Sequence, residues 1–177
     1  MANSEHVQII KSGPDAFAQW REQNPDTALD LAGADLTGVD LKGAKIRAAN
    51  LQGANLSGAL LGRASLAGAN LAGADLEAAD LGHASLTGAN CSGASLVNVN
   101  LFRADLNNCD LSGATLRLCR LGRASLMGAN LAGADFSQAN MIEADLRNTN
   151  LEGTKFHSSN MTGADSGRAF MHGEDFT

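Results

Sequence analysis

The fold is decided by a stretch in which residues 49–81 read ANLQGANLSGALLGRASLAGANLAGADLEAADL. A large apolar residue recurs at every fifth position, and a small residue, usually alanine, stands two positions before it. The column extends without an insertion from Leu31 to Met161, which makes 27 consecutive positions, with Cys91 as its one smaller member. A period of five matches neither an α-helix nor a strand, so the pattern predicts a solenoid of short extended pieces joined by corners.

A second period of 20 residues lies on top of the first. Two residues after the apolar column, glycine occupies all eight sites of one series: Gly33, Gly53, Gly73, Gly93, Gly113, Gly133, Gly153 and Gly173. In the next series only Gly38 and Gly58 of seven sites are glycine. Four five-residue units therefore form one coil, and residues 20 apart stack at a strand spacing of about 4.8 Å. Glycine suits the third position of a type II turn, where φ is positive.

Composition and charge restrict the class of protein. The chain has 177 residues and a net charge of −6, which is neither the basic balance of a nucleic-acid binder nor the dense acidity of a nucleic-acid mimic. The three cysteines all fall at inward positions of the repeat, which is typical of free thiols in a reducing compartment. No signal peptide and no apolar run of membrane-spanning length is visible. We therefore expect a cytoplasmic protein that binds neither membrane nor nucleic acid directly.

Residues 1–28 lie outside the repeat and are expected to form an N-terminal cap. Residues 6–10, HVQII, are consistent with a short strand, and Pro14 begins a predicted helix that ends near Gln23. Phe17 and Trp20 are three residues apart and share one face of this helix. A helix this short needs tertiary contacts, so we expect Phe17 and Trp20 to cover the open first coil.

The repeat resembles the pentapeptide-repeat protein family, whose motif is A(D/N)LXX. Residues 34–36, 54–56, 69–71 and 74–76 show the motif nearly verbatim, and the resemblance covers about residues 29–165. It implies an all-β solenoid, a right-handed quadrilateral parallel β-helix of about seven coils over residues 29–177. The leader is similar to the N-terminal capping helices of some bacterial and cyanobacterial members.

The motif departs from its pattern near the C-terminal end. Ser166 replaces a large apolar residue, and Phe170 stands where Asp or Asn is usual, before Met171 and Phe176 restore the column. We therefore expect an irregular last coil from about residue 165. An uncovered β-helix end exposes apolar side chains, and similar family members often dimerise through the C-terminal coil. Phe170, Met171 and Phe176 are the predicted homodimer interface.

Outward positions are the only places for a binding site, and one series of them is basic. It consists of Arg63, His83, Arg103 and Arg123, each 20 residues from the next, and is called here the basic ladder. The structural interpretation is that these side chains splay into solvent or meet neighbours such as Asp80 and Asp105. The functional one is a ridge that binds an acidic partner surface, because the guanidinium group pairs well with carboxylates.

A second anomaly stands beside the basic ladder. Val97, Phe102 and Leu118 occupy outward positions that are usually polar, and Arg117 and Arg120 are close in sequence. Together they are predicted to form an apolar and basic patch over two adjacent coils. Apolar anchors combined with Arg are common in protein interfaces, although single exposed apolar residues are also common on any surface.

No pattern in the sequence indicates catalysis, a metal site or a cofactor. The four histidines have neither nucleophile nor metal-ligand spacing, and Glu152 with His172 offers only two ligands on adjacent coils. The recurring Asp residues belong to the repeat motif, and an uninterrupted repeat leaves no loop for a pocket.

Two functions remain. The first is a non-catalytic interaction or scaffold module that presents flat faces to an unidentified protein partner. The second follows from the resemblance, since some family members imitate DNA, bind the topoisomerase gyrase and protect it from quinolones or toxins. That function needs a face of concentrated negative charge. Residues 29–177 hold 15 acidic and 11 basic residues, so the first function is favoured.

Overall fold

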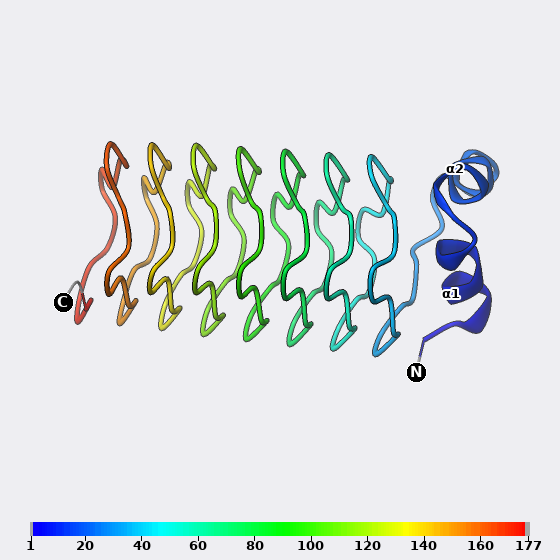
Figure 1. The fold of residues 1–177 in the computed structure, drawn as a ribbon, viewed down its shortest axis with the longest axis horizontal. Helices are drawn as coiled ribbons and strands as arrows, with labels where there is room; N and C mark the ends of the chain where they lie inside the picture. Colours follow the sequence, from blue (N-terminus) through cyan, green and yellow to red (C-terminus); the bar gives the residue numbers. More distant parts are fainter. Residues whose placement is uncertain (1, 176–177) are drawn as a thin grey trace.

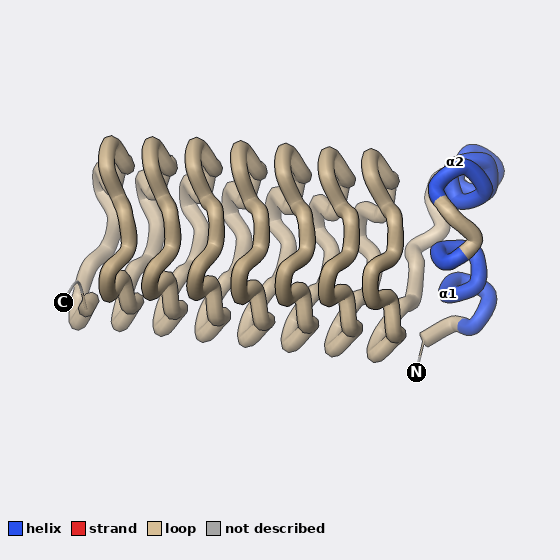
Figure 2. The backbone as a smooth tube through the Cα atoms, viewed as in Figure 1, coloured by secondary structure: helices blue, strands red, loops and turns tan. Residues whose placement is uncertain are grey.

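A computed structural model describes residues 2–175 as a straight stack of coils with two helices at one end (Figure 1). Helix α1 (Ser4–Lys11) and helix α2 (Pro14–Gln23) precede the first coil, and the last coil lies at the opposite end of the rod. The predicted β solenoid is therefore correct. Within residues 2–175 the coils contain isolated parallel bridges instead of extended strands (Figure 2), because each side of a coil is only five residues long.

The register between coils is 20 residues along the whole rod. Bridges pair Asp30 with Asn50 and continue at every fifth residue, up to Lys155 with Asp175. Two backbone hydrogen bonds support each bridge: the N–H of Leu31 donates to Asn50 O (2.7 Å), and the N–H of Asn50 donates to Leu29 O (2.8 Å). The 20-residue period in the sequence is therefore the circumference of one coil.

Every side of a coil ends in a tight turn. In the first, Ala34 N donates to Leu31 O (3.0 Å) and Gly33 has a φ of 68°. The same left-handed backbone occurs at the third turn position throughout the rod, including 14 residues that are not glycine. Turns with positive φ are thus not confined to the glycine-rich series, and many side chains tolerate a conformation that favours glycine.

The apolar column fills the interior. Its members between Leu31 and Phe156 are at most 2% exposed, and the alanines two positions before them are also buried, except Ala44 in the first coil, because the coil is too narrow for larger side chains. Cys91, Cys109 and Cys119 are free and buried. Burial raises the pKa of all three thiols, to about 12 for Cys109 and Cys119, so they stay protonated. The Sγ of Cys109 donates to Leu86 O (2.8 Å).

The cap differs from the prediction in one element. Residues 6–10 belong to α1, so the expected strand is wrong. The side chain of Asn3 caps this helix by accepting from Glu5 N (2.9 Å), and the buried Ile10 lies three positions after the half-buried Val7 on the inner side. The imidazole Nδ1 of His6 accepts from Asp30 N (3.0 Å), which ties α1 to the first coil.

Helix α2 begins at Pro14, as the sequence predicts. Phe17 is 1% exposed and belongs to the core of the rod, whereas Trp20 is only half-buried and stacks on Phe17 with ring centroids 6.0 Å apart. Phe17 therefore provides the expected cover of the first coil, and Trp20 contributes from the side.

The backbone at the C-terminal end is more regular than expected. Bridges Asp145–Asp165 and Asn150–Phe170 keep the 20-residue register on both sides of Ser166, so the departure of the motif does not change the register there. The irregularity lies in the side chains. Met161 and Ala164 are only partly buried, because no described coil covers them.

Candidate protein-interaction surface

The basic ladder lies along one edge of the rod, at the third turn position of successive coils. Its four residues have φ values of 60°, 59°, 55° and 58°, and all four side chains are exposed. Their backbone N–H groups are tied to the next coil; that of Arg63 donates to Gly82 O and that of His83 donates to Phe102 O, each at 2.9 Å. The left-handed backbone and these bonds hold the four side chains in register.

Three of the four ladder residues form no ion pair within the described part of the chain. Arg123 donates through Nε to Glu143 Oε2 (2.7 Å), and this bond raises the pKa of Arg123. For Arg63, His83 and Arg103, no carboxylate of residues 2–175 comes within ion-pair distance.

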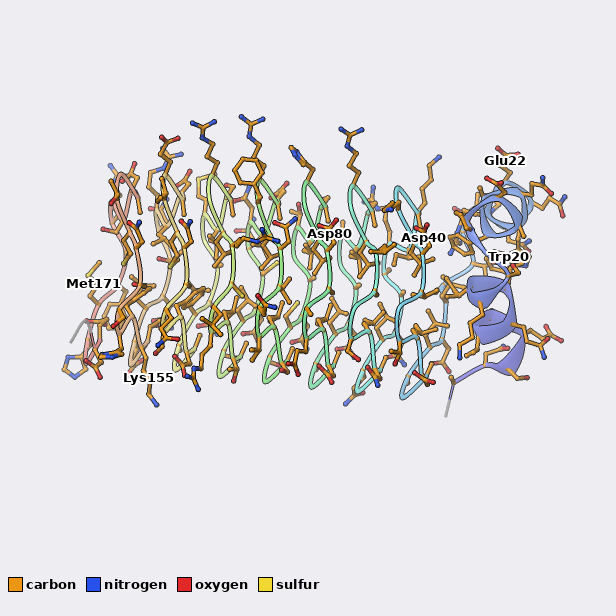
Figure 3. All side chains as sticks on the ribbon, in the orientation of Figure 1. Trp20, Glu22, Asp40, Asp80, Lys155 and Met171 are labelled. Atoms are coloured by element: carbon orange, nitrogen blue, oxygen red, sulfur yellow. The ribbon has the colours of Figure 1, made fainter. Side chains whose placement is uncertain are left out.

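The expected neutralising neighbours are engaged elsewhere. Asp80 accepts from Asn100 Nδ2 (2.7 Å), and Asp105 accepts from Thr87 Oγ1 (2.9 Å). Figure 3 shows Asp40 and Asp80 in one row along the rod. Of the two arrangements in the structural interpretation, the ladder side chains therefore extend into solvent and do not form ion pairs with Asp80 or Asp105.

Phe102 is part of the ladder surface. Its ring meets the His83 imidazole edge-on, with centroids 5.9 Å apart, and the Arg103 guanidinium lies 5.3 Å from its centroid. On the other side the ring lies against Gly122, where an added Cβ would come within 3.3 Å of the ring. Phe102 is nevertheless 40% exposed, so it presents an apolar surface between basic groups.

A hollow of about 580 Å³ lies beside the ladder, and sequence reasoning missed it. It is lined by Lys42, Gly43, Gly62, Arg63, Asp80, Gly82, His83, Asn100 and Phe102. At Gly82 an added Cβ would come within 3.1 Å of Asn100 Nδ2, so a side chain there would crowd the floor of the hollow. The signal in the sequence was the pair Gly62 and Gly82, each directly after a residue of the apolar column.

The members of the predicted patch are divided between two corners of the coil: Val97, Arg117 and Leu118 belong to one corner, and Phe102 belongs to the next. Leu118 is 48% exposed and has a φ of 61°. The exposed Arg117 is next to it, and both lie on the corner of the coil that comes before the corner of Arg123. Val97 is only half-buried, and Arg120 is exposed and bridges with Asn100. The recorded ring contacts of Phe102 are with His83 and Arg103. The structure thus joins Phe102 to the basic ladder.

At the C-terminal end, Phe170 is 58% and Met171 is 44% exposed. Phe176, the third residue of the predicted dimer interface, lies outside the described residues. The end-to-end homodimer therefore stays a prediction, which light scattering at micromolar concentration would check.

The described residues show no constellation for metal chemistry. Among residues 2–175, no group of three or more His, Cys, Asp or Glu side chains is placed to hold a metal ion. His172 uses its backbone N–H to bond the carboxylate of Glu174. Neither described helix has the length and apolar character needed to span a membrane.

Comparison with known proteins places this geometry in a family. The family model for pentapeptide repeats matches in eight copies, over residues 27–63, 64–101, 84–123, 104–141 and 124–163. No curated protein matches the chain.

Several solved structures are similar to it. HetL, a pentapeptide repeat protein involved in heterocyst differentiation regulation from the cyanobacterium Nostoc sp. strain PCC 7120, is 32% identical. The match covers 82% of this chain and 77% of HetL, with a TM-score of 0.38. The pentapeptide repeat protein alr5209 from Nostoc PCC 7120 is 31% identical. The match covers 67% of this chain and 84% of alr5209, with a TM-score of 0.47. QnrB1, a plasmid-mediated fluoroquinolone resistance protein, is 20% identical. The match covers 79% of this chain and 80% of QnrB1, with a TM-score of 0.36. On the family-model match, which spans more than half of its residues, the chain belongs to the pentapeptide repeat family.

Proposed function

We propose that the chain is a non-catalytic protein-interaction module whose basic ladder binds an acidic surface of a partner protein. The observation that carries the proposal is the run of Arg63, His83 and Arg103, which stack on successive coils without an ion-pair partner among residues 2–175. Basic groups held so close repel one another when charged, and a row of partner carboxylates would relieve that repulsion.

The backbone of the ladder residues is strained, as it is at other turns of the rod. Each ladder residue has a left-handed backbone, which costs roughly 1–2 kcal/mol for a residue with a Cβ, and ten other non-glycine residues among those described share it. Glycine, which adopts this backbone freely, occupies the third turn position at other corners of the same coils, for example at Gly73 and Gly93. Glycine is therefore an unstrained replacement at each ladder position.

The surroundings of the ladder fit a protein partner better than a free ion. Phe102 supplies an exposed aromatic ring, and the adjoining hollow has room for a partner side chain. Aromatic and Arg residues are the types most enriched among the energetically dominant positions of interfaces. The arrangement therefore suits an acidic surface that carries one apolar side chain.

Glycine substitution tests the proposal without damaging the fold. We expect Arg63→Gly combined with Arg103→Gly to raise the free energy of unfolding by about 0.5–1 kcal/mol per site, since relief of strain exceeds the entropy that glycine adds to the unfolded chain. The same variant should lose its partner. Affinity capture by the wild-type chain from a lysate of the source cells identifies the acidic protein. The Kd of the double variant for that protein, measured with purified components, should be at least about tenfold higher than that of the wild type.

Arg168→Gly is the matched control for each single site. Arg168 is an exposed arginine with a φ of 60° on a different corner, so its replacement removes the same charge and the same strain. The control should retain the partner. The proposal would be contradicted if the double variant captured the same proteins as the wild type in equal amounts. It would also be contradicted if the wild type captured no acidic protein.

Gyrase protection by DNA mimicry is the alternative that the sequence left open. A mimic must present negative charge where DNA has phosphates, and the ladder edge presents the opposite sign. A gyrase supercoiling assay with and without a quinolone decides between the two. Protection at submicromolar protein would favour the alternative over an acidic partner.

A further inference from the structure

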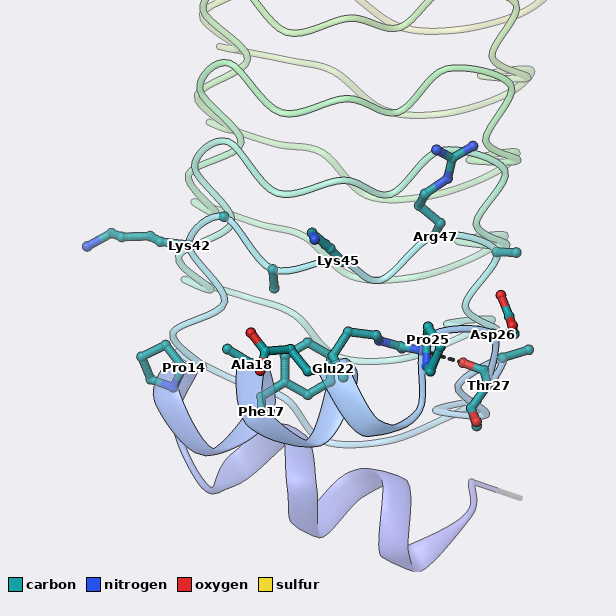
Figure 4. A pocket seen from close by; sticks show the side chains of 15 residues that line it. Pro14, Phe17, Ala18, Glu22, Pro25, Asp26, Thr27, Lys42, Lys45 and Arg47 are labelled. Carbon is teal, nitrogen blue, oxygen red and sulfur yellow. Dashed lines mark hydrogen bonds between the residues drawn. The ribbon is translucent and has the colours of Figure 1, made fainter.

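A second candidate site lies between the cap and the first coil, and we call it the cap cleft. It has a volume of about 550 Å³ and is lined by Pro14, Phe17, Ala18, Arg21 and Glu22 of α2, by residues 25–28, and by Lys42, Gly43, Ala44, Lys45, Arg47 and Ala48 of the first coil. The helix residues are spaced 3 or 4 apart, so they form one face of α2. Figure 4 shows Lys45 above Glu22 across the cleft, with Lys42 and Arg47 at its two sides.

The cap leaves this corner of the first coil unfinished. Ala44 is only partly buried, whereas Ala64, the equivalent residue one coil later, is 1% exposed. The backbone is open as well: in the next coil the N–H of Ser65 donates to Ala44 O (2.9 Å), and Ser65 O accepts from Ile46 N (3.0 Å). The equivalent N–H and C=O of Lys45 have no hydrogen-bond partner among residues 2–175.

The carbonyl of Arg47 is unpaired among the described residues for the same reason. Its equivalent one coil later, Ala67 O, accepts from Ala48 N (3.0 Å). The N–H and C=O of Lys45 and the C=O of Arg47 therefore point to the position that a preceding coil would occupy. The cap cleft lies at that position. An exposed strand edge of this kind is a template for an added extended segment.

The cleft is also electropositive. Arg21, Lys42, Lys45 and Arg47 line it, against the two carboxylates of Glu22 and Asp26. Arg21 is 8% exposed, and its guanidinium lies over both the Phe17 ring and the Trp20 ring, 5.5 and 5.1 Å from their centroids. Its Nη1 donates to Thr27 O (2.7 Å) and Asn24 O (3.0 Å), while Nε and Nη2 have no partner in the described residues. The base of the cleft thus carries a fixed cation whose charge its neighbours leave incompletely satisfied.

From these observations we propose that the cap cleft binds an extended acidic peptide segment, which pairs with the backbone of Lys45 and Arg47 and thereby adds one more rung to the solenoid. Its carboxylates face Lys42, Lys45 and Arg47, and its remaining side chains lie on the apolar part of the cleft formed by Pro14, Ala18 and Ala44. The site is separate from the basic ladder, and the proposal does not depend on the function of the ladder.

The peptide Glu-Val-Glu-Val-Glu-amide, with fluorescein coupled to its N-terminal amine, is the probe for the wild-type chain. We expect saturable binding by fluorescence anisotropy with a Kd on the order of 100 µM, and a parallel change in the emission of Trp20, the single tryptophan, which contacts Arg21. The same peptide with methylated backbone nitrogens keeps its charge but cannot donate to the carbonyls of Lys45 and Arg47. It should bind at least about tenfold more weakly.

Charge variants locate the site. Lys45→Glu with Arg47→Glu, both exposed residues, should weaken binding of the unmodified peptide at least about tenfold. Lys155→Glu with Arg168→Glu makes the same charge change on exposed residues of the last coils and should leave the Kd unchanged, as should Arg63→Gly on the ladder.

Three results would each overturn the proposal. Equal affinity for the methylated peptide would mean attraction to charge without backbone pairing. Equal weakening by both double charge variants would mean binding to no defined site. Absence of saturation at millimolar wild-type protein would mean that the cleft takes no acidic peptide. The ladder variants are tested by capture of a partner protein, which is a separate measurement. Failure of peptide binding at the cap cleft would therefore not contradict the proposed function of the ladder.

Discussion

Leu86→Lys is expected to abolish cooperative folding of the middle of the rod. Leu86 is fully buried in a coil whose neighbours place Leu66 and Leu106 directly above and below it, and the interior offers no carboxylate to an ammonium group. The substitution removes roughly 1.5–3 kcal/mol of apolar burial and adds several kcal/mol for an unpaired buried charge. That sum is comparable to the total stability of a typical domain, about 5–15 kcal/mol.

Urea denaturation followed by far-ultraviolet circular dichroism measures this effect. We expect the variant to lose the single sharp transition, because each coil is stabilised only by its neighbours and an unfolded middle separates the two ends. Gln52→Lys is the control, since it adds the same charge at an exposed turn position and should change the free energy of unfolding by less than about 0.5 kcal/mol. A native-like transition for Leu86→Lys would show that the inward register is wrong.

Phe17→Ala is expected to detach the cap before the coils unfold. Phe17 is 1% exposed, and its ring touches both Trp20 and the Arg21 guanidinium, so truncation removes the main apolar contact of α2 together with the stacking. Deleting a buried Phe side chain costs about 3–5 kcal/mol, which exceeds what a helix of ten residues can offset by itself.

Trp20 reports this loss directly. In the variant its fluorescence should shift to the red and become quenchable by acrylamide at low urea, while circular dichroism still shows folded coils. Phe17→Leu, which keeps most of the volume, should retain one shared transition. If tryptophan exposure and coil unfolding coincide in Phe17→Ala, then the cap and the rod form one cooperative unit instead.

Sequence patterns predict most of this fold because each coil repeats the same local problem. The apolar column and the small residues before it can be buried together only if every fifth residue points inward. The 20-residue segregation of glycine likewise indicates how many units close a coil. The stacking of Arg63 over His83 and Arg103 follows from that register alone. The helix beginning at Pro14 is predictable because its start signals are local.

The mistaken predictions involve contacts that the repeat does not determine. Residues 6–10 are rich in strand-forming side chains, yet they form α1 because Asn3 caps the helix and because Ile10 becomes buried against the rod. Phe102 joins the basic ladder instead of Leu118 because Gly122 leaves room for its ring on that side. Neither outcome has a signal within one repeat unit.

By itself, the sequence determined the inward column, the 20-residue coil and the alignment of the basic ladder, since all three depend on spacing along a chain of fixed geometry. Only the tertiary structure decided which charges stay unpaired and where the solenoid is left open. Asp80 and Asp105 turn to Asn100 and Thr87 because hydrogen bonds between adjacent coils compete for their oxygens. The cap cleft exists because α2 covers the core through Phe17 yet leaves the backbone edge at Lys45 unpaired among the described residues, and that depends on how two non-repeating helices dock.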